Sequence, residues 1–181
     1  MKFPSSLMDE TCSAWGGVIN DTRCLPSGLD GVCLLQALAD NESSYGRKAV
    51  PRHEKAYDWG GRYLDKEQFE LWGSWSAHSY GPFQVMWTNV VKYGPECNPW
   101  LATIDPSVTA EAATKMVLRL IVPRHHGDKT IEDWVKDIGW DYNAGSHSAP
   151  APIDYMSKLL SNYQKRVEQR FHHGSPGAVP S

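Results

Sequence analysis

Apolar side chains recur at helical spacing in four segments of this 181-residue chain, and no segment alternates apolar and polar residues as a half-buried strand would. The four segments are Gly31 to Glu42, Asp105 to the residue before Pro123, Thr130 to Tyr142, and Ile153 to Phe171. A period near 3.6 residues gives a helix one apolar face, so these segments predict helices that pack on one another. A chain of this length fits one core. We expect a mainly α, single-domain protein.

The remaining segments lack a clear period. Residues 1–30 contain Gly16-Gly17 and Pro26 and predict a loop, with a short helix at most, that wraps the core. Residues 43–80 predict an irregular insert with a short helix near Asp65 to Leu71, and a further helix is expected after Met86, through Tyr93. We therefore divide the chain into an N-terminal segment (1–30), a main domain (31–171) and a flexible tail (172–181).

Composition narrows the possible partners. The formal net charge of -3 offers no surplus of Lys and Arg for phosphate contacts, so no nucleic acid is expected. No stretch has the roughly 20 apolar residues needed to span a bilayer, and Met1 to Glu10 lacks the apolar core of a signal peptide. We expect no membrane span and a monomer. The eight Trp can pack in the core or line a ligand groove.

Cysteine and histidine give no metal signature. Cys12, Cys24, Cys33 and Cys97 do not have zinc-site spacing, and free thiols or one N-terminal disulfide are both compatible with their positions. Among the seven His, His53 and the adjacent His125-His126 pair are the candidate ligands, but neighbouring side chains on a helix point in different directions. A serine hydrolase is not expected, because no Gly-x-Ser-x-Gly motif occurs. We expect no metal and no cofactor.

Glu42 is the residue whose position asks for a chemical explanation. It follows Leu35 and Leu38 at helical spacing and so falls on the apolar face of its helix, near the C-terminal end. Burial there disfavours the charged carboxylate and raises its pKa, which leaves a proton available near neutral pH. Such a carboxyl group can protonate a glycosidic oxygen. The alternative is a glutamate in solvent at the helix end, or one paired with Arg47.

Three separated segments together resemble motifs of the soluble lytic transglycosylases. They are Ala39-Asp-Asn-Glu-Ser-Ser44, Tyr80-Gly-Pro-Phe-Gln-Val-Met86 and Asp141-Tyr-Asn-Ala-Gly145. The resemblance covers about residues 31 to 165 and implies a lysozyme-like fold of the goose-type kind, with the insert after the catalytic helix. Two departures, Pro82-Phe83 and Asp141, alter the usual motifs and are expected to affect substrate preference.

The resemblance also implies a reaction and a set of site residues. Glu42 would act first as acid and then as base in cleaving the β-1,4 bond between N-acetylmuramic acid and N-acetylglucosamine, leaving 1,6-anhydromuramoyl ends. Ser43 would orient that carboxyl group or contact substrate, Gln84 would lie beside the acid, and Tyr142 and Asn143 would hold the sugar and the carboxyl group. Tyr80 and Met86, from the second motif, are further candidate substrate-binding residues. Such an enzyme acts on the cell wall and would be periplasmic, secreted or phage-delivered.

Two other functions stay open. Glu54 or Asp141 could activate water opposite Glu42, which would make the protein a muramidase or, since chitin shares the β-1,4-linked N-acetylglucosamine backbone, a chitinase. A non-catalytic glycan-binding module would instead use the Trp side chains only as sugar platforms. The candidate platforms are Trp59, Trp72, Trp75 and Trp87.

Overall fold

A computed structural model describes residues 1–22, 25–124, 129–144 and 150–173 and is mainly helical, as expected. The α-helices are α1 (Ser5–Asn20), α2 (Gly31–Ser43), α3 (Lys66–Trp72), α4 (Trp87–Tyr93), α5 (Pro99–Ile104), α6 (Pro106–Met116), α7 (Ile131–Ala144) and α8 (Ile153–His173). Short 3-10 helices span Lys55–Tyr57, Gly73–Ala77 and Val122–Arg124, and a π-helical segment, Val117–Ile121, continues α6.

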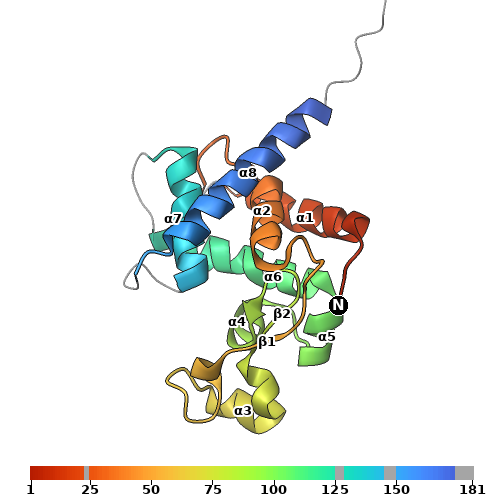
Figure 1. The fold of residues 1–181 in the computed structure, drawn as a ribbon, viewed down its shortest axis with the longest axis vertical. Helices are drawn as coiled ribbons and strands as arrows, with labels where there is room; N and C mark the ends of the chain where they lie inside the picture. The colour runs from red at the N-terminus through yellow and green to blue at the C-terminus, as the bar shows by residue number, and fades with distance from the viewer. Residues whose placement is uncertain (23–24, 125–128, 145–149, 174–181) are drawn as a thin grey trace, which may run out of the picture.

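Helix α2 lies at the centre of the upper half of the molecule, with α1 on one side and α8 crossing it (Figure 1). Asp30 caps its N-terminus by accepting hydrogen bonds from the backbone N–H groups of Val32 and Cys33. Leu34, Leu35 and Leu38 are fully buried. The apolar surroundings of α2 therefore extend to the turn in which Glu42 lies.

The N-terminal segment contains a regular helix of 16 residues, α1, where a loop with at most a short helix was expected. Gly16 and Gly31 allow α1 and α2 to approach closely: a Cβ atom at Gly16 would overlap the Cα of Val32, and one at Gly31 would lie 2.5 Å from the Cβ of Ile19. Of the two glycines interpreted as a helix break, Gly16 thus belongs to a helix crossing, whereas nothing lies within 4 Å of a Cβ atom at Gly17. Met8, Cys12 and Ile19 are buried on this helix.

A small antiparallel sheet, in the order β1–β2–β3, was not expected. Strands β1 (Arg52–His53), β2 (His78–Tyr80) and β3 (Val85–Met86) pair with Arg52 opposite Ser79 and Ser79 opposite Met86. Strands of two or three residues are too short to show an alternating pattern. The sheet lies with α3, α4 and α5 in the lower half of the molecule, below α6 (Figure 1).

Most of the other expected elements are confirmed. Helices α3, α4, α7 and α8 occupy the expected segments, and the Thr130 hydroxyl accepts the Asp133 N–H at 3.1 Å, which caps α7. Helix α6 starts at Pro106 as expected, but its α-helical part ends at Met116. Helix α5 was not predicted. Gly145, which ends the third motif segment, lies outside the described residues, as does the tail beyond residue 173.

Cys12, Cys33 and Cys97 carry free thiols, and burial raises the pKa of Cys12 to about 12 and that of Cys33 to about 11. Cys24, His125 and His126 lie outside the described residues. Within the described part of the chain, no group of three or more His, Cys, Asp or Glu residues is arranged to hold a metal ion. None of the helices described there is long and apolar enough to cross a membrane.

Candidate active site around Glu42

Glu42 lies in the last turn of α2 and accepts a hydrogen bond from a residue that is distant in the sequence. The Tyr155 hydroxyl, in the first turn of α8, donates to Glu42 Oε1 at 2.6 Å. The neighbouring Asn41 fixes this arrangement, because its amide donates to the Tyr155 carbonyl at 3.2 Å and accepts from Asn162 at 2.7 Å. The contact between α2 and α8 therefore determines where Tyr155 meets the carboxyl group.

The surroundings of Glu42 favour its protonated form. Burial is the largest influence and raises its pKa above the ordinary value, and the negative charge of Glu54 acts in the same direction. The hydrogen bond from Tyr155 and the charges of Arg52 and Lys158 oppose this rise without cancelling it. The residue as a whole is nonetheless partly exposed to solvent. A desolvated but accessible carboxyl group is the arrangement required of a general acid.

Tyr142 brings the second and third sequence motifs to the first. Its hydroxyl donates to the backbone carbonyl of Phe83 at 2.8 Å, which joins α7 to the turn between β2 and β3. Burial and the nearby charge of Glu42 raise the Tyr142 pKa well above its ordinary value, so its hydroxyl keeps its proton. The three segments that carry the resemblance thus meet around Glu42.

Gln84 holds the β2–β3 turn in shape. It has a φ of 46°, a left-handed conformation that is uncommon for a residue other than glycine. Its amide group donates to the carbonyls of Gly81 and Val50 at 2.9 and 3.2 Å and accepts from the Ser79 hydroxyl at 3.1 Å. These bonds stabilise the conformation and direct the side chain toward the turn, where it connects the turn with the segment before β1.

Two residues proposed to contact substrate are buried. Ser43 is 1% exposed, and its hydroxyl donates to the Ala39 carbonyl and accepts from the Gly46 N–H, so it closes the end of α2. Tyr80 is 0% exposed; its ring packs edge-on against Trp87, and its hydroxyl donates to the Trp75 carbonyl. Both side chains are occupied by the fold itself, and neither reaches the surface to meet a ligand.

The other predicted site residues are at or near the surface, except for Asp141, which is buried. Met86 is partly exposed at the end of β3, and Asn143 is exposed on α7. Glu54 is paired with Arg52 at 2.6 Å, and both lie within electrostatic range of Glu42. Asp141 is only 3% exposed and is therefore poorly placed to activate a water molecule. Arg47 donates to the Ser44 carbonyl, so the partner of Glu42 is Tyr155 and not Arg47.

Sequence reasoning missed Tyr155, Arg52 and Lys158. Tyr155 immediately precedes the first apolar residue of the repeat that predicted α8, and its closeness to Glu42 depends on how that helix docks. Arg52 and Lys158 look like ordinary surface cations in the sequence. The one available signal was the motif Arg52-His-Glu54, which places a cation two residues from a candidate carboxylate.

Three exposed tryptophans surround a second feature, on the lower half of the molecule. Trp72, Trp75 and Trp100, with Asn98 and Pro99, line a hollow of about 300 Å³, which we call the tryptophan hollow. Their residues are 38%, 54% and 66% exposed. The centre of the Trp75 ring lies 5.7 Å from that of the His78 ring, and the His78 ring centre lies 5.0 Å from that of His53. In the sequence, His53 stands between Arg52 and Glu54. Aromatic side chains thus connect this hollow with the surroundings of Glu42.

Trp59 and Trp87 lie outside the hollow. Trp59 is 73% exposed beside Phe69, whereas Trp87 is 1% exposed and belongs to the core. The prediction that Trp87 serves as a sugar platform is therefore wrong, because its ring is covered by protein.

We compared the chain with protein family models, with curated proteins and with solved structures, and none of these comparisons gave a match. The geometry around Glu42 and the tryptophan hollow are therefore the basis for assigning a function.

Proposed function

We propose that the protein is a lysozyme-like enzyme that cleaves peptidoglycan at the cell wall, as a lytic transglycosylase acting between N-acetylmuramic acid and N-acetylglucosamine. The observation that carries this proposal is Glu42, a partly exposed residue whose carboxyl group is desolvated and accepts a hydrogen bond from Tyr155. The meeting of the three motif segments through Tyr142 and Phe83 supports it further.

The geometry suggests which carboxyl oxygen delivers the proton. Oε1 accepts the hydrogen bond from Tyr155, so Oε2 is the oxygen that carries the proton toward substrate. Protonation of the glycosidic oxygen breaks its bond to C1 of the muramoyl unit and leaves positive charge on that sugar. The Glu42 carboxylate formed in this step is then stabilised by Tyr155 and by the charges of Arg52 and Lys158.

The same carboxylate completes the reaction. It accepts the proton of the muramoyl C6 hydroxyl while that oxygen bonds to C1, which closes the 1,6-anhydro ring and restores the protonated acid. No second carboxylate takes part. This agrees with the burial of Asp141 and with the ion pair that occupies Glu54.

The tryptophan hollow supports a sugar polymer as substrate. Pyranose rings present C–H groups on their faces, and exposed indole rings offer matching apolar surfaces. The Asn98 side-chain oxygen accepts the Leu101 N–H, so its NH₂ group is the part that can donate to a sugar hydroxyl. A non-catalytic glycan-binding module would use this hollow as well, but it would have no use for a desolvated acid.

Hydrolysis is the second candidate, and the position of Glu54 favours it. Its charge acts on Glu42, so Glu54 is the carboxylate that this candidate would use together with Glu42. If Glu54 left Arg52, it could activate water and give an inverting muramidase or chitinase.

The test is a digest of purified peptidoglycan with the wild-type protein and with Glu42→Gln, followed by mass spectrometry of the released muropeptides. Anhydromuramoyl ends, each lighter by one water than a reducing end and absent with the variant, are expected. Reducing ends lost in both Glu42→Gln and Glu54→Gln would establish hydrolysis instead. Release unaffected by Glu42→Gln would refute the role of this residue, and no release from peptidoglycan or chitin would leave only the binding module.

A further inference from the structure

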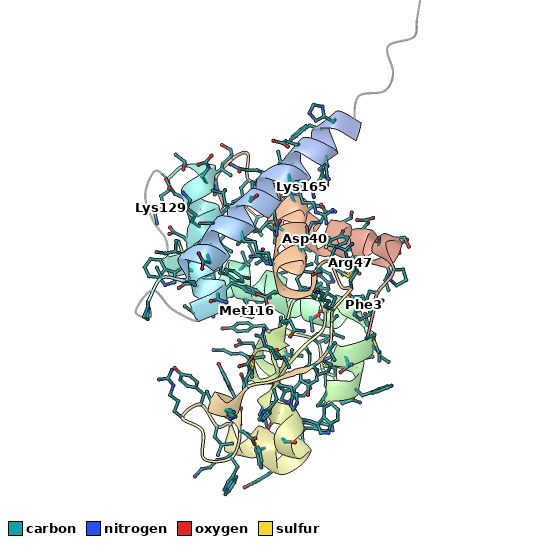
Figure 2. The ribbon with its side chains drawn as sticks, viewed as in Figure 1. Phe3, Asp40, Arg47, Met116, Lys129 and Lys165 are labelled. Atoms are coloured by element: carbon teal, nitrogen blue, oxygen red, sulfur yellow. The ribbon has the colours of Figure 1, made fainter. Side chains whose placement is uncertain are left out.

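A second hollow, of about 480 Å³, lies where α8 crosses α2 beside α1. Four basic residues line it: Arg47, Lys158, Lys165 and Arg166. Two acidic residues, Asp9 and Asp40, line it as well. Figure 2 shows Lys165 on α8, Asp40 on α2 and Arg47 just beyond α2 gathered in this region. We call this feature the basic hollow.

The two acids are already engaged by protein groups. Asp40 is paired with Arg166 at 2.8 Å, and Asp9 accepts the Tyr45 hydroxyl. The Arg166 guanidinium also lies 4.2 Å from the centre of the Tyr45 ring, which fixes the floor of the hollow. Arg166 and Asp40 thus neutralise each other, so the charge of the hollow is set by the Asp9 carboxylate and the other three cations.

Arg47, Lys158 and Lys165 are those remaining cations. Among the described residues, Arg47 and Lys158 donate to backbone carbonyls, those of Ser44 and Asn41. Across the ranges that the structure describes, no carboxylate forms an ion pair with Lys165. The basic hollow therefore keeps an excess of two positive charges, in a chain whose formal net charge is -3. Such a local excess is suited to an anionic ligand.

The basic hollow adjoins the site around Glu42. Lys158 belongs to both, because it lines the hollow and its charge acts on the Glu42 carboxyl group. Ser44, two residues after Glu42, also lines the hollow. A ligand held at Glu42 can therefore extend past Lys158 toward Lys165.

We propose that the basic hollow binds the carboxylates of the peptide stem that peptidoglycan carries on its muramoyl units. This inference depends on the proposed function and goes further, since it selects stem-bearing peptidoglycan over chitin, which is uncharged and has no stem. An extended peptide covers about 3.3 to 3.6 Å per residue, so a stem of four residues reaches roughly 13 to 14 Å from its sugar. Carboxylates along that length would meet ammonium and guanidinium groups.

The catalytic arm of the test uses Arg47→Gln/Lys165→Gln, with Lys66→Gln on α3 as a matched surface control. Both proteins are assayed on stem-bearing peptidoglycan and on the same strands after an amidase has removed the stems. We expect the double variant to lose roughly threefold to tenfold in kcat/KM on stem-bearing strands only, the range for two exposed charge pairs. The loss should shrink at high salt. An equal loss on both substrates, or no loss on either, would overturn the proposal.

The binding arm separates this inference from the proposed function. Free stem tetrapeptide is titrated into Glu42→Gln, and chemical shifts are followed by NMR. Shifts confined to the basic hollow, and abolished by Arg47→Gln/Lys165→Gln, are expected even if no cleavage is found. Absence of binding, or equal shifts from inorganic phosphate at the same concentration, would refute recognition of the stem while leaving cleavage by Glu42 to its own assay.

Discussion

The Tyr155 hydroxyl donates a 2.6 Å hydrogen bond to Oε1 of Glu42, across 113 positions of the sequence. This bond connects the first turn of α8 with the last turn of α2 and leaves Oε2 as the proton donor in the reaction proposed above. It also stabilises the charged carboxylate, and so restrains a pKa that burial raises.

Tyr155→Phe should therefore lower activity and change its pH dependence. Loss of a hydrogen bond to a charged group costs about 1.5 to 3 kcal/mol, so we expect kcat to fall by roughly tenfold to a hundredfold. Because the bond lowers the Glu42 pKa, its loss should move the alkaline limb of the pH–rate profile to higher pH. The control is Tyr63→Phe on the exposed insert. A lower rate without a shift of the alkaline limb would mean that Tyr155 does not influence the pKa of Glu42.

Glu42→Gln should stabilise the protein, and the gain should depend on pH. A carboxyl group whose pKa is raised by folding destabilises the native state once pH exceeds its unfolded value, and the cost grows until the folded pKa is passed. The variant should thus melt higher than wild type at pH 8, and the difference should shrink as pH falls toward 4.5. Thermal unfolding at a series of pH values measures this. A difference that is constant with pH would contradict the raised pKa.

Trp100→Ala should weaken sugar binding without harming the fold, because the Trp100 residue is 66% exposed. Loss of one aromatic face should cost about 1 kcal/mol, or roughly fivefold in Kd. The measurement is a titration with a chitooligosaccharide, followed by tryptophan fluorescence, of Glu42→Gln with and without Trp100→Ala. Trp59→Ala, outside the tryptophan hollow, is the matched control. If both variants bind like the parent protein, the tryptophan hollow is not a sugar site.

Gly16→Ala and Gly17→Ala are adjacent substitutions in α1 that should change the free energy of unfolding in opposite directions: Gly16→Ala should lower it and Gly17→Ala should raise it. A methyl group at Gly16 meets the backbone of α2 and should cost about 1 to 3 kcal/mol, whereas nothing lies within 4 Å of one at Gly17. Gly17→Ala should then gain about 0.5 to 1 kcal/mol from helix propensity. Urea unfolding of both variants tests the crossing of α1 and α2. Equal effects would mean that the helices are not in close contact there.

The long helices could be predicted because their apolar faces repeat over many residues, as in α2, α7 and α8. Helix α1 could not, since Gly16-Gly17 resembles a break until the backbone of α2 is known to lie against Gly16. The strands were missed because two or three residues carry no period. Their pairing depends on contacts between Arg52 and Ser79, which are 27 residues apart.

In the candidate site, too, the residues recognised from local sequence could be predicted, whereas those that depend on how the helices pack could not. Glu42 could be predicted because a glutamate on an apolar helix face is unusual, and this depends on local sequence alone. Tyr155 could not, because its role comes from the docking of α8. Ser43 and Tyr80 were proposed from a motif that gives residue types but not side-chain directions, and the structure buries both.

The order of synthesis gives the Tyr155–Glu42 bond a consequence for folding on the ribosome. Glu42 on α2 is synthesised before Tyr142 on α7 and Tyr155 on α8. Until α8 docks, the carboxyl group lacks its hydrogen bond from Tyr155 and is more exposed to water than in the folded protein. A nascent chain that stops before Ile153 would therefore contain Glu42 without the Tyr155 hydroxyl that meets its carboxyl group in the folded protein.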